Sequence, residues 1–167
     1  MTIEELNKLQ EPKLMVKLLQ CCGSSTWMTQ LIRLMPFMSL EDLLTKSDQA
    51  WQKTDEKDWL EAFSHHPKIG DLKSLEQKFA STKVFAQGEQ SSVSTARHET
   101  LEQLAEGNSL YEKKFGFIFI VFATGKSAEE MLVILNQRIS NDRSTELRIA
   151  AGEQQKITKL RLQKLIS

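Results

Sequence analysis

The chain has 167 residues, 40% of them hydrophobic, and its 22 basic side chains balance its 22 acidic ones. A chain of this length is expected to form one domain, here residues 1–167, with a real hydrophobic core. Because it carries no net charge, nucleic-acid binding and attachment to an acidic membrane surface are both disfavoured.

Hydrophobic residues at helical spacing predict five helices in the first 64 residues. Thr2 and Glu5 have the spacing of a capping box and open the first helix. The next three run from Pro12 to about Gln20, from the Gly23–Thr26 break to Pro36, and from Ser39 to about Trp51. The fifth covers residues 55–64, with one apolar face made of Trp59, Leu60 and Phe63.

The fifth helix leads into a corner built around His66 and Pro67. Proline disfavours helical geometry at the preceding residue, so the helix should end at or before His66. Gly70 permits a tight backbone turn, and Asp71 could cap the following helix. An imidazole on such a corner is placed to transfer protons near neutral pH, although His-Pro pairs are also ordinary helix terminators.

Hydrophobic spacing predicts further helices in the second half of the chain. We expect residues 71–80 to form one helix, and residues 81–94 to form a connecting loop or the start of another helix. A helix capped by Ser94 or Thr95 follows, with a break or kink at Gly107. The capping box at Ser127–Glu130 opens a helix that continues through Ile139, and residues 145–165 form a long final helix.

Residues 115–122 differ from the rest because they are rich in aromatic and β-branched side chains, which favour an extended conformation. No other stretch could pair with this segment as a convincing strand. We therefore predict an all-α, single-domain helical bundle of roughly eight to nine helices, with one buried extended apolar segment.

Three ionisable side chains lie in contexts that suggest positioning: His66, Glu89 and Arg138. Glu89 follows Gly88, which allows a tight turn, but a glutamate in the first turn of a helix is favourable for structural reasons alone. Arg138 lies near the end of its helix. An arginine there complements the helix dipole, so a purely structural role is favoured over ligand binding unless an anionic ligand is present.

The other candidates are weaker. Cys21 and Cys22 are too few for a disulfide framework and lack the surroundings of a nucleophile, so we expect reduced, partly buried thiols. His65 and His98 are expected to be exposed. No spacing suits a metal site or a phosphate-binding loop, which leaves acid–base chemistry without a cofactor. Neither an export signal nor a membrane-spanning run is visible, so we expect a cytoplasmic protein.

Four motifs resemble, in their order, those of the decarboxylases of 2-oxo-4-hydroxy-4-carboxy-5-ureidoimidazoline (OHCU), which act in urate breakdown. These motifs are His66-Pro67-Lys68-Ile69-Gly70, Gly88-Glu89-Gln90, Asn108 through Phe119, and Arg138 through Asn141-Asp142 into the helix of residues 146–162. With Gly23–Trp27 added, the resemblance covers nearly the whole chain. It implies an all-helical enzyme without cofactor or metal, often a homodimer, that releases carbon dioxide to give (S)-allantoin.

The resemblance also implies site residues. It assigns catalysis to His66 and Glu89 and substrate binding to Glu89 and Arg138, and the expected substrate contacts further include Pro67, Phe117, Ile118, Phe119 and Ile120. Members of the family often carry a serine where this chain has Ala86, so one hydroxyl contact would be missing. That departure leaves open an enzyme of the same fold acting on a related hydroxy-carboxylate ring. The other alternative is a non-catalytic helical adaptor.

Overall fold

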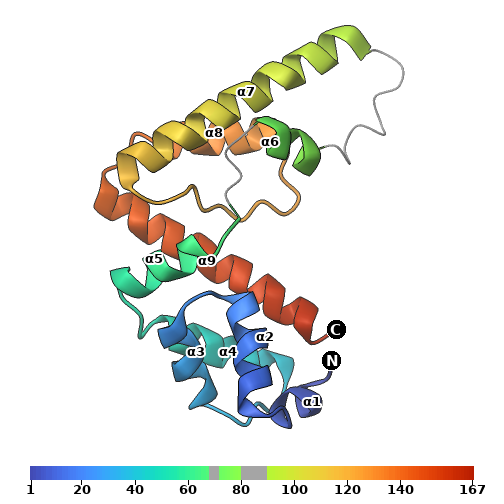
Figure 1. Cartoon of the computed structure of the whole chain (residues 1–167), viewed down its shortest axis with the longest axis vertical. Helices are drawn as coiled ribbons and strands as arrows, with labels where there is room; N and C mark the ends of the chain where they lie inside the picture. Colours follow the sequence, from blue (N-terminus) through green and yellow to red (C-terminus); the bar gives the residue numbers. More distant parts are fainter. Residues whose placement is uncertain (68–71, 80–89) are drawn as a thin grey trace. The chain divides into compact units, whose positions relative to one another are not determined.

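The computed structural model of the chain describes residues 1–67, 72–79 and 90–167. Helices and connecting segments, without strands, make up these residues, which confirms the predicted all-α fold (Figure 1). The described helices are α1 (Ile3–Asn7), α2 (Glu11–Cys21), α3 (Ser25–Ile32), α4 (Leu40–Trp51), α5 (Glu56–Ser64), α6 (Leu72–Phe79), α7 (Gln90–Phe115), α8 (Ala128–Arg138) and α9 (Arg143–Leu165).

These helices group into two compact units. Unit 1 contains residues 1–66, 120–122 and 147–167, and unit 2 contains the described parts of residues 67–119 and 123–146. Each unit is therefore described by itself, and the organisation of residues 1–167 as one domain stays a prediction.

Side-chain caps explain where several helices begin. The Thr2 hydroxyl accepts a hydrogen bond from the Glu5 backbone N–H at 3.1 Å, which confirms the predicted capping box of α1. The capping box of α8 is also confirmed, since Ser127 accepts from the Glu130 N–H at 3.1 Å. Helix α5 ends at Ser64, before the His-Pro corner, as predicted.

In unit 1, α3 packs against α2, α4 and α5. Its Trp27 side chain is fully buried, and the indole N–H donates to the backbone oxygen of Ser47 at 3.2 Å. Asp48, the next residue of α4, accepts a hydrogen bond from Gln155 at 2.6 Å and pairs with Lys159 at 2.7 Å. These contacts hold α9 against α4, and so fix which face of α9 points into unit 1.

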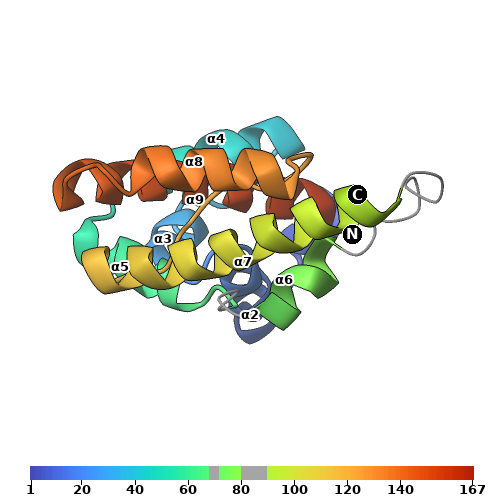
Figure 2. The same ribbon diagram turned by 90° about the horizontal axis from the view of Figure 1, so that it is seen from above.

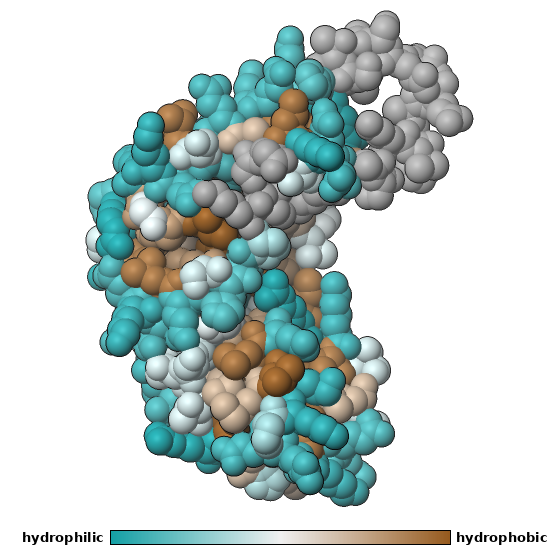
Figure 3. Space-filling view, viewed as in Figure 1, coloured by the Kyte–Doolittle hydropathy of each residue, from teal (hydrophilic) through white to brown (hydrophobic). Residues whose placement is uncertain are grey.

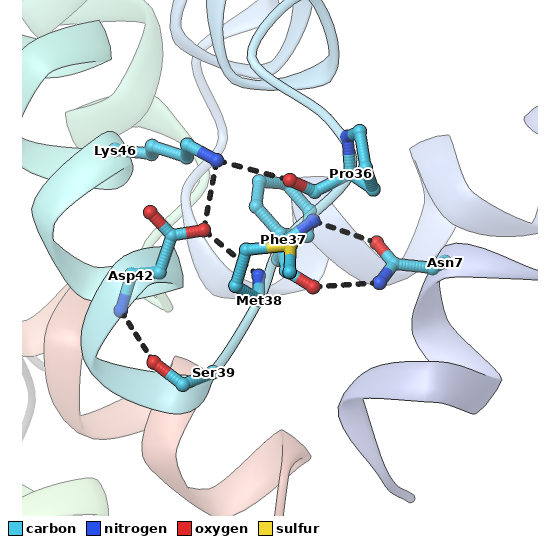
Figure 4. A network of polar contacts seen from close by, with 7 residues as sticks. All are labelled: Asn7, Pro36, Phe37, Met38, Ser39, Asp42 and Lys46. Atoms are coloured by element: carbon cyan, nitrogen blue, oxygen red, sulfur yellow. Dashed lines mark hydrogen bonds and ion pairs between the residues drawn. The ribbon is translucent and has the colours of Figure 1, made fainter.

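The segment between α3 and α4 is held by the polar network drawn in Figure 4. The Asn7 side-chain amide donates to the Phe37 carbonyl at 2.8 Å and accepts from the Phe37 N–H at 2.9 Å. Asp42 accepts from the Met38 N–H and from Lys46, and the lysine lowers the pKa of this carboxyl below its usual value. The loop is thus tied both to α1 and to the first turns of α4.

In unit 2, α7 packs against α6 and α8, and Figure 2 shows α7 and α8 running side by side. The predicted cap at Ser94 or Thr95 is wrong, because α7 begins at Gln90. Of the break or kink predicted at Gly107, no break occurs, since the helix continues through this residue. Packing against α8 explains why a glycine lies inside this helix. A Cβ atom on Gly107 would overlap the Leu135 side chain of α8, so the glycine permits a close approach of the two helices.

Gly107→Ala is therefore expected to destabilise the protein by about 1 kcal/mol. Alanine gains about 0.5–1 kcal/mol of helix propensity, but overpacking against the fully buried Leu135 costs about 1–3 kcal/mol. The matched control is Gly152→Ala in α9, where nothing lies within 4 Å of an added Cβ. Denaturant unfolding should show Gly152→Ala stabilised by about 0.5–1 kcal/mol; equal effects at the two sites would contradict this account.

Between α7 and α8 the chain from Gly116 onward forms neither helix nor strand, whereas Phe115, the first residue of the segment predicted to be extended, is the last residue of α7. Phe117 and Ile120 are buried, with 5% and 2% of their surface exposed, although the segment pairs with no strand of the described chain. On the face shown in Figure 3, hydrophilic side chains predominate and small hydrophobic patches lie among them. None of the helices in the described part of the chain combines the length and the apolar composition that a membrane span requires.

Candidate active site

Unit 1 contains a cavity of about 380 Å³, a size suited to a small ligand. Val16 and Leu19 of α2 supply apolar lining. Two imidazoles, from His65 and His66, and the guanidinium of Arg161 supply polar lining. A cavity with this lining can bind a small polar molecule, and its cation favours negative charge.

The end of α5 approaches this cavity closely because Gly23 has no side chain. A Cβ atom on Gly23 would lie 2.5 Å from both Cβ and Cγ of His65, far inside van der Waals contact. Any other residue at position 23 would push the His65-His66 corner away. Gly23, the first residue of the Gly23–Trp27 motif, therefore allows the corner that contains His66 to lie close to the end of α2.

His66 is half-buried, and its side chain contacts α9. Its Nε2 atom lies 2.5 Å from Oε1 of Gln154, whose side chain is fully buried. Burial is the main cause that lowers the pKa of His66 below its ordinary value of 6.5, and Arg161 and His65 lower it further. Around neutral pH the imidazole is neutral, the form that can accept a proton.

Arg161 is a candidate that reasoning from the sequence missed. It lies on α9, and its Nη1 atom is 3.4 Å from the carbonyl oxygens of Gln20 and Cys21, where α2 ends. Those last carbonyls lack helical partners and attract a cation. Residues 154, 158 and 161 share one face of a helix by spacing, a signal visible in the sequence, but only the fold shows that this face meets His66.

Arg138, the arginine singled out from the sequence, is buried in unit 2 and paired with a carboxylate. Its Nε atom donates to Oε1 of Glu146 at 2.6 Å, and a second guanidinium nitrogen forms an ion pair with the same oxygen. Glu146 is fully buried and also accepts from the Tyr111 hydroxyl at 2.5 Å and from the Asn141 amide at 3.2 Å. Burial, with this carboxylate, raises the pKa of the Tyr111 hydroxyl.

Aromatic rings surround this buried ion pair. The Arg138 guanidinium lies 4.7 Å from the centre of the Phe119 ring. Tyr111 contacts Phe119 and Phe117, with ring centres 5.2 Å and 5.9 Å apart. Phe117 and Phe119, two of the expected substrate contacts, therefore lie beside Arg138 inside unit 2, and their contact with substrate stays a prediction.

The remaining candidates fall in several places. Glu89 and Ala86 lie outside the described residues. Pro67 is exposed, Ile118 is half-buried and Ile120 is buried. His98 on α7 is exposed beside Glu76 and Glu102, as expected.

The two cysteines are free and buried, as expected of reduced thiols. Burial raises the pKa of both Cys21 and Cys22 to about 11. Both side chains are therefore neutral thiols around neutral pH, which disfavours a nucleophilic role.

Comparison with known proteins links the chain to one family. The family model described as OHCU decarboxylase matches residues 7–163. The chain is 44% identical, over 149 residues, to the uric acid degradation bifunctional protein TTL of Arabidopsis thaliana, a match that covers 88% of this chain and 45% of that protein. It is 26% identical to the 2-oxo-4-hydroxy-4-carboxy-5-ureidoimidazoline decarboxylase of Halalkalicoccus jeotgali, over 99% of this chain and 92% of that protein.

A solved structure agrees with these matches. The crystal structure of an OHCU decarboxylase in the presence of (S)-allantoin is 39% identical, with a TM-score of 0.71, over 89% of this chain and 95% of that one. The chain spans less than half the length of its bifunctional relatives, since it covers 45% of the Arabidopsis protein and 33% of the PucL protein of Bacillus subtilis.

Proposed function

Since the chain belongs to the OHCU decarboxylase family, we propose that it removes carbon dioxide from OHCU and yields (S)-allantoin. The observation that carries the proposal is the cavity of unit 1, where a neutral imidazole and a guanidinium line one space of about 380 Å³. A homodimer, a cytoplasmic location and a reaction without cofactor or metal stay predictions from the sequence.

The chemistry of the substrate explains why these residue types are suitable. OHCU carries a hydroxyl and a carboxylate on one ring carbon, beside a carbon–nitrogen double bond. When the bond to the carboxylate breaks, carbon dioxide leaves and the released electron pair forms a carbon–carbon double bond. The electron pair of the carbon–nitrogen double bond moves to the ring nitrogen, which takes a proton from solvent. The hydroxyl then loses its proton to become a carbonyl, and the neighbouring carbon gains a proton on one face.

His66 supplies the proton transfers in this proposal. The neutral imidazole accepts or polarises the hydroxyl proton, and the imidazolium so formed can return a proton to the neighbouring carbon. Its lowered pKa supports the first role, because the neutral form predominates around neutral pH. Glu89, which lies outside the described residues, is proposed to orient the imidazole or bind the hydroxyl.

Arg161 supplies the cation. A guanidinium can donate two hydrogen bonds to a ring carbonyl or to the ureido oxygen, which holds the substrate and stabilises developing negative charge. Arg161 supports this role because it lines the same cavity as His66. Arg138 was the arginine predicted from the sequence, but Glu146 and Tyr111 already engage its guanidinium.

A pair of variants separates the two arginines. Arg161→Ala is expected to raise KM by about 10- to 100-fold, because it removes a charge-assisted contact of about 1.5–3 kcal/mol to substrate. The free energy of unfolding should fall by only about 1 kcal/mol, because the hydrogen bonds of Arg161 to the end of α2 are long. Arg138→Ala is expected mainly to lower stability, because it leaves Glu146 buried and unpaired. Steady-state kinetics and urea unfolding of both variants provide the check; a raised KM at unchanged stability in Arg138→Ala alone would make Arg138 the substrate cation.

The overall proposal is tested by incubating the protein with freshly prepared OHCU and following circular dichroism. We expect (S)-allantoin to form stereoselectively and faster than in the spontaneous reaction. A rate equal to the spontaneous one would reject the decarboxylase and favour the non-catalytic adaptor. Turnover of a related hydroxy-carboxylate ring in preference to OHCU would favour the second enzyme, for which Ala86 leaves room.

A further inference from the structure

A buried amide faces the imidazole of the proposed active site. Gln154 on α9 has none of its surface exposed, and its Oε1 atom lies 2.5 Å from Nε2 of His66. Burying an amide is costly unless each polar atom finds a partner, and both ends of this amide do. The second partner is Thr158, one turn further along α9, whose Oγ1 atom lies 3.2 Å from Nε2 of Gln154.

Thr158 determines which way the amide points. Its hydroxyl has a single proton and donates it to the Gln154 backbone carbonyl at 2.9 Å. Towards the Gln154 side chain the hydroxyl therefore acts as an acceptor, which requires the amide NH₂ on that side. The amide oxygen then faces His66, and an oxygen can only accept. Nε2 of His66 must be the donor.

We propose that Gln154 is a positioning residue that holds the neutral imidazole of His66 as the Nε2–H tautomer, so that Nδ1 is the atom that accepts the substrate's proton. A neutral imidazole has one donor and one acceptor nitrogen, and assigning the donor assigns the acceptor. The catalytic part of this inference rests on the proposed function, whereas the assignment of the tautomer does not.

Positive groups beside His66 disfavour its charged form. From the end of α5, His65 lies beside it, and from α9, Arg161 lines the same cavity; both lower the pKa of His66. The Cys22 thiol, which reaches Thr158, has a pKa of about 11 and carries no charge around neutral pH. The hydrogen bond to the uncharged Gln154 amide raises the pKa of His66, but burial is the larger effect and keeps the pKa below its ordinary value.

The test measures the tautomer directly. Long-range ¹H–¹⁵N correlation spectra distinguish the Nε2–H from the Nδ1–H form of a histidine, and we expect Nε2–H for His66 in the unaltered protein above pH 7. A predominant Nδ1–H form would overturn the proposal. This measurement needs neither turnover nor a folded variant.

Two variants and a matched control test the role in catalysis. Gln154→Glu places a carboxylate against Nε2, so the acid limb of kcat/KM should move up by about one to three pH units. Gln154→Leu should lower kcat by about 10- to 100-fold with little change in KM, because the ring is no longer held in place. Gln155→Leu, next along the helix, loses a hydrogen bond to Asp48 and should change neither the tautomer nor the pH profile.

The outcomes separate the two proposals. An inactive protein that shows the Nε2–H form would contradict the proposed function alone. An active protein whose pH profile is the same in Gln154→Glu as in Gln155→Leu would contradict the role of Gln154 alone.

Discussion

The His66→Ala variant is expected to lose OHCU turnover by a factor of about 10²–10⁴, the contribution typical of a positioned general acid–base group. The free energy of unfolding should fall by only about 1 kcal/mol, because His66 is half-buried and gives up one hydrogen bond, to Gln154. The control is His98→Ala on α7, an exposed histidine of unit 2, which should keep full turnover. Turnover within threefold of the unaltered protein in His66→Ala would remove His66 from catalysis.

The dependence on pH gives an independent measure of the same group. Burial lowers the pKa of His66 below 6.5, so kcat/KM should fall as pH drops through that lowered value. Stability should change in the same direction. The unfolded chain binds more protons than the folded one between the two pKa values, so the contribution of His66 to stability is lost as pH falls through that range. An acid limb that persists in His66→Ala would assign it to another group.

The second large effect is on stability: Glu146→Ala is expected to lower the free energy of unfolding by about 3–5 kcal/mol. Glu146 is fully buried and is the common acceptor for Arg138, Tyr111 and Asn141, so its removal leaves a buried guanidinium without its counter-charge. Because a whole domain is stable by only about 5–15 kcal/mol, the loss would be conspicuous in urea unfolding. A loss below about 1 kcal/mol would contradict this account.

A double variant tests the physical reason. In Arg138→Met with Glu146→Leu both charges are replaced by apolar side chains of similar length, so no buried charge is left unpaired. We expect the double variant to recover part of the stability lost in Glu146→Ala, but not all of it, because Tyr111 still lacks its acceptor. A double variant less stable than Glu146→Ala would show that packing, and not charge, dominates at this site.

Local signals in the sequence were sufficient for most of the fold. The caps at Thr2 and Ser127 act through residues within one turn of the chain, so their spacing alone predicted where α1 and α8 begin. The break predicted at Gly107 is absent because a contact distant in the sequence, and not a local signal, determines the structure there. Glycine usually interrupts helices, and only its distant neighbour Leu135 explains why it lies inside α7.

The site was predicted less completely than the fold. His66 stood out because Pro67 fixes the end of its helix, a local effect. Arg138 and Arg161 look alike in the sequence, since each is an arginine near the end of a helix. Their difference depends on partners far along the chain: Glu146 and Tyr111 engage Arg138, whereas Arg161 reaches the carbonyls that end α2. Such pairings are set by packing, which periodicity does not encode.

The single helical face that carries Gln154, Thr158 and Arg161 makes this part of the chain sensitive to length. Exchanging Arg161 leaves the contacts among His66, Gln154 and Thr158 in place, and exchanging Gln154 or Thr158 leaves Arg161 in place. Inserting or deleting one residue just ahead of Gln154 would instead turn every later side chain by about 100° around the axis of α9. Mutagenesis libraries of this protein should therefore accept substitutions along this segment far more readily than frame-preserving insertions or deletions.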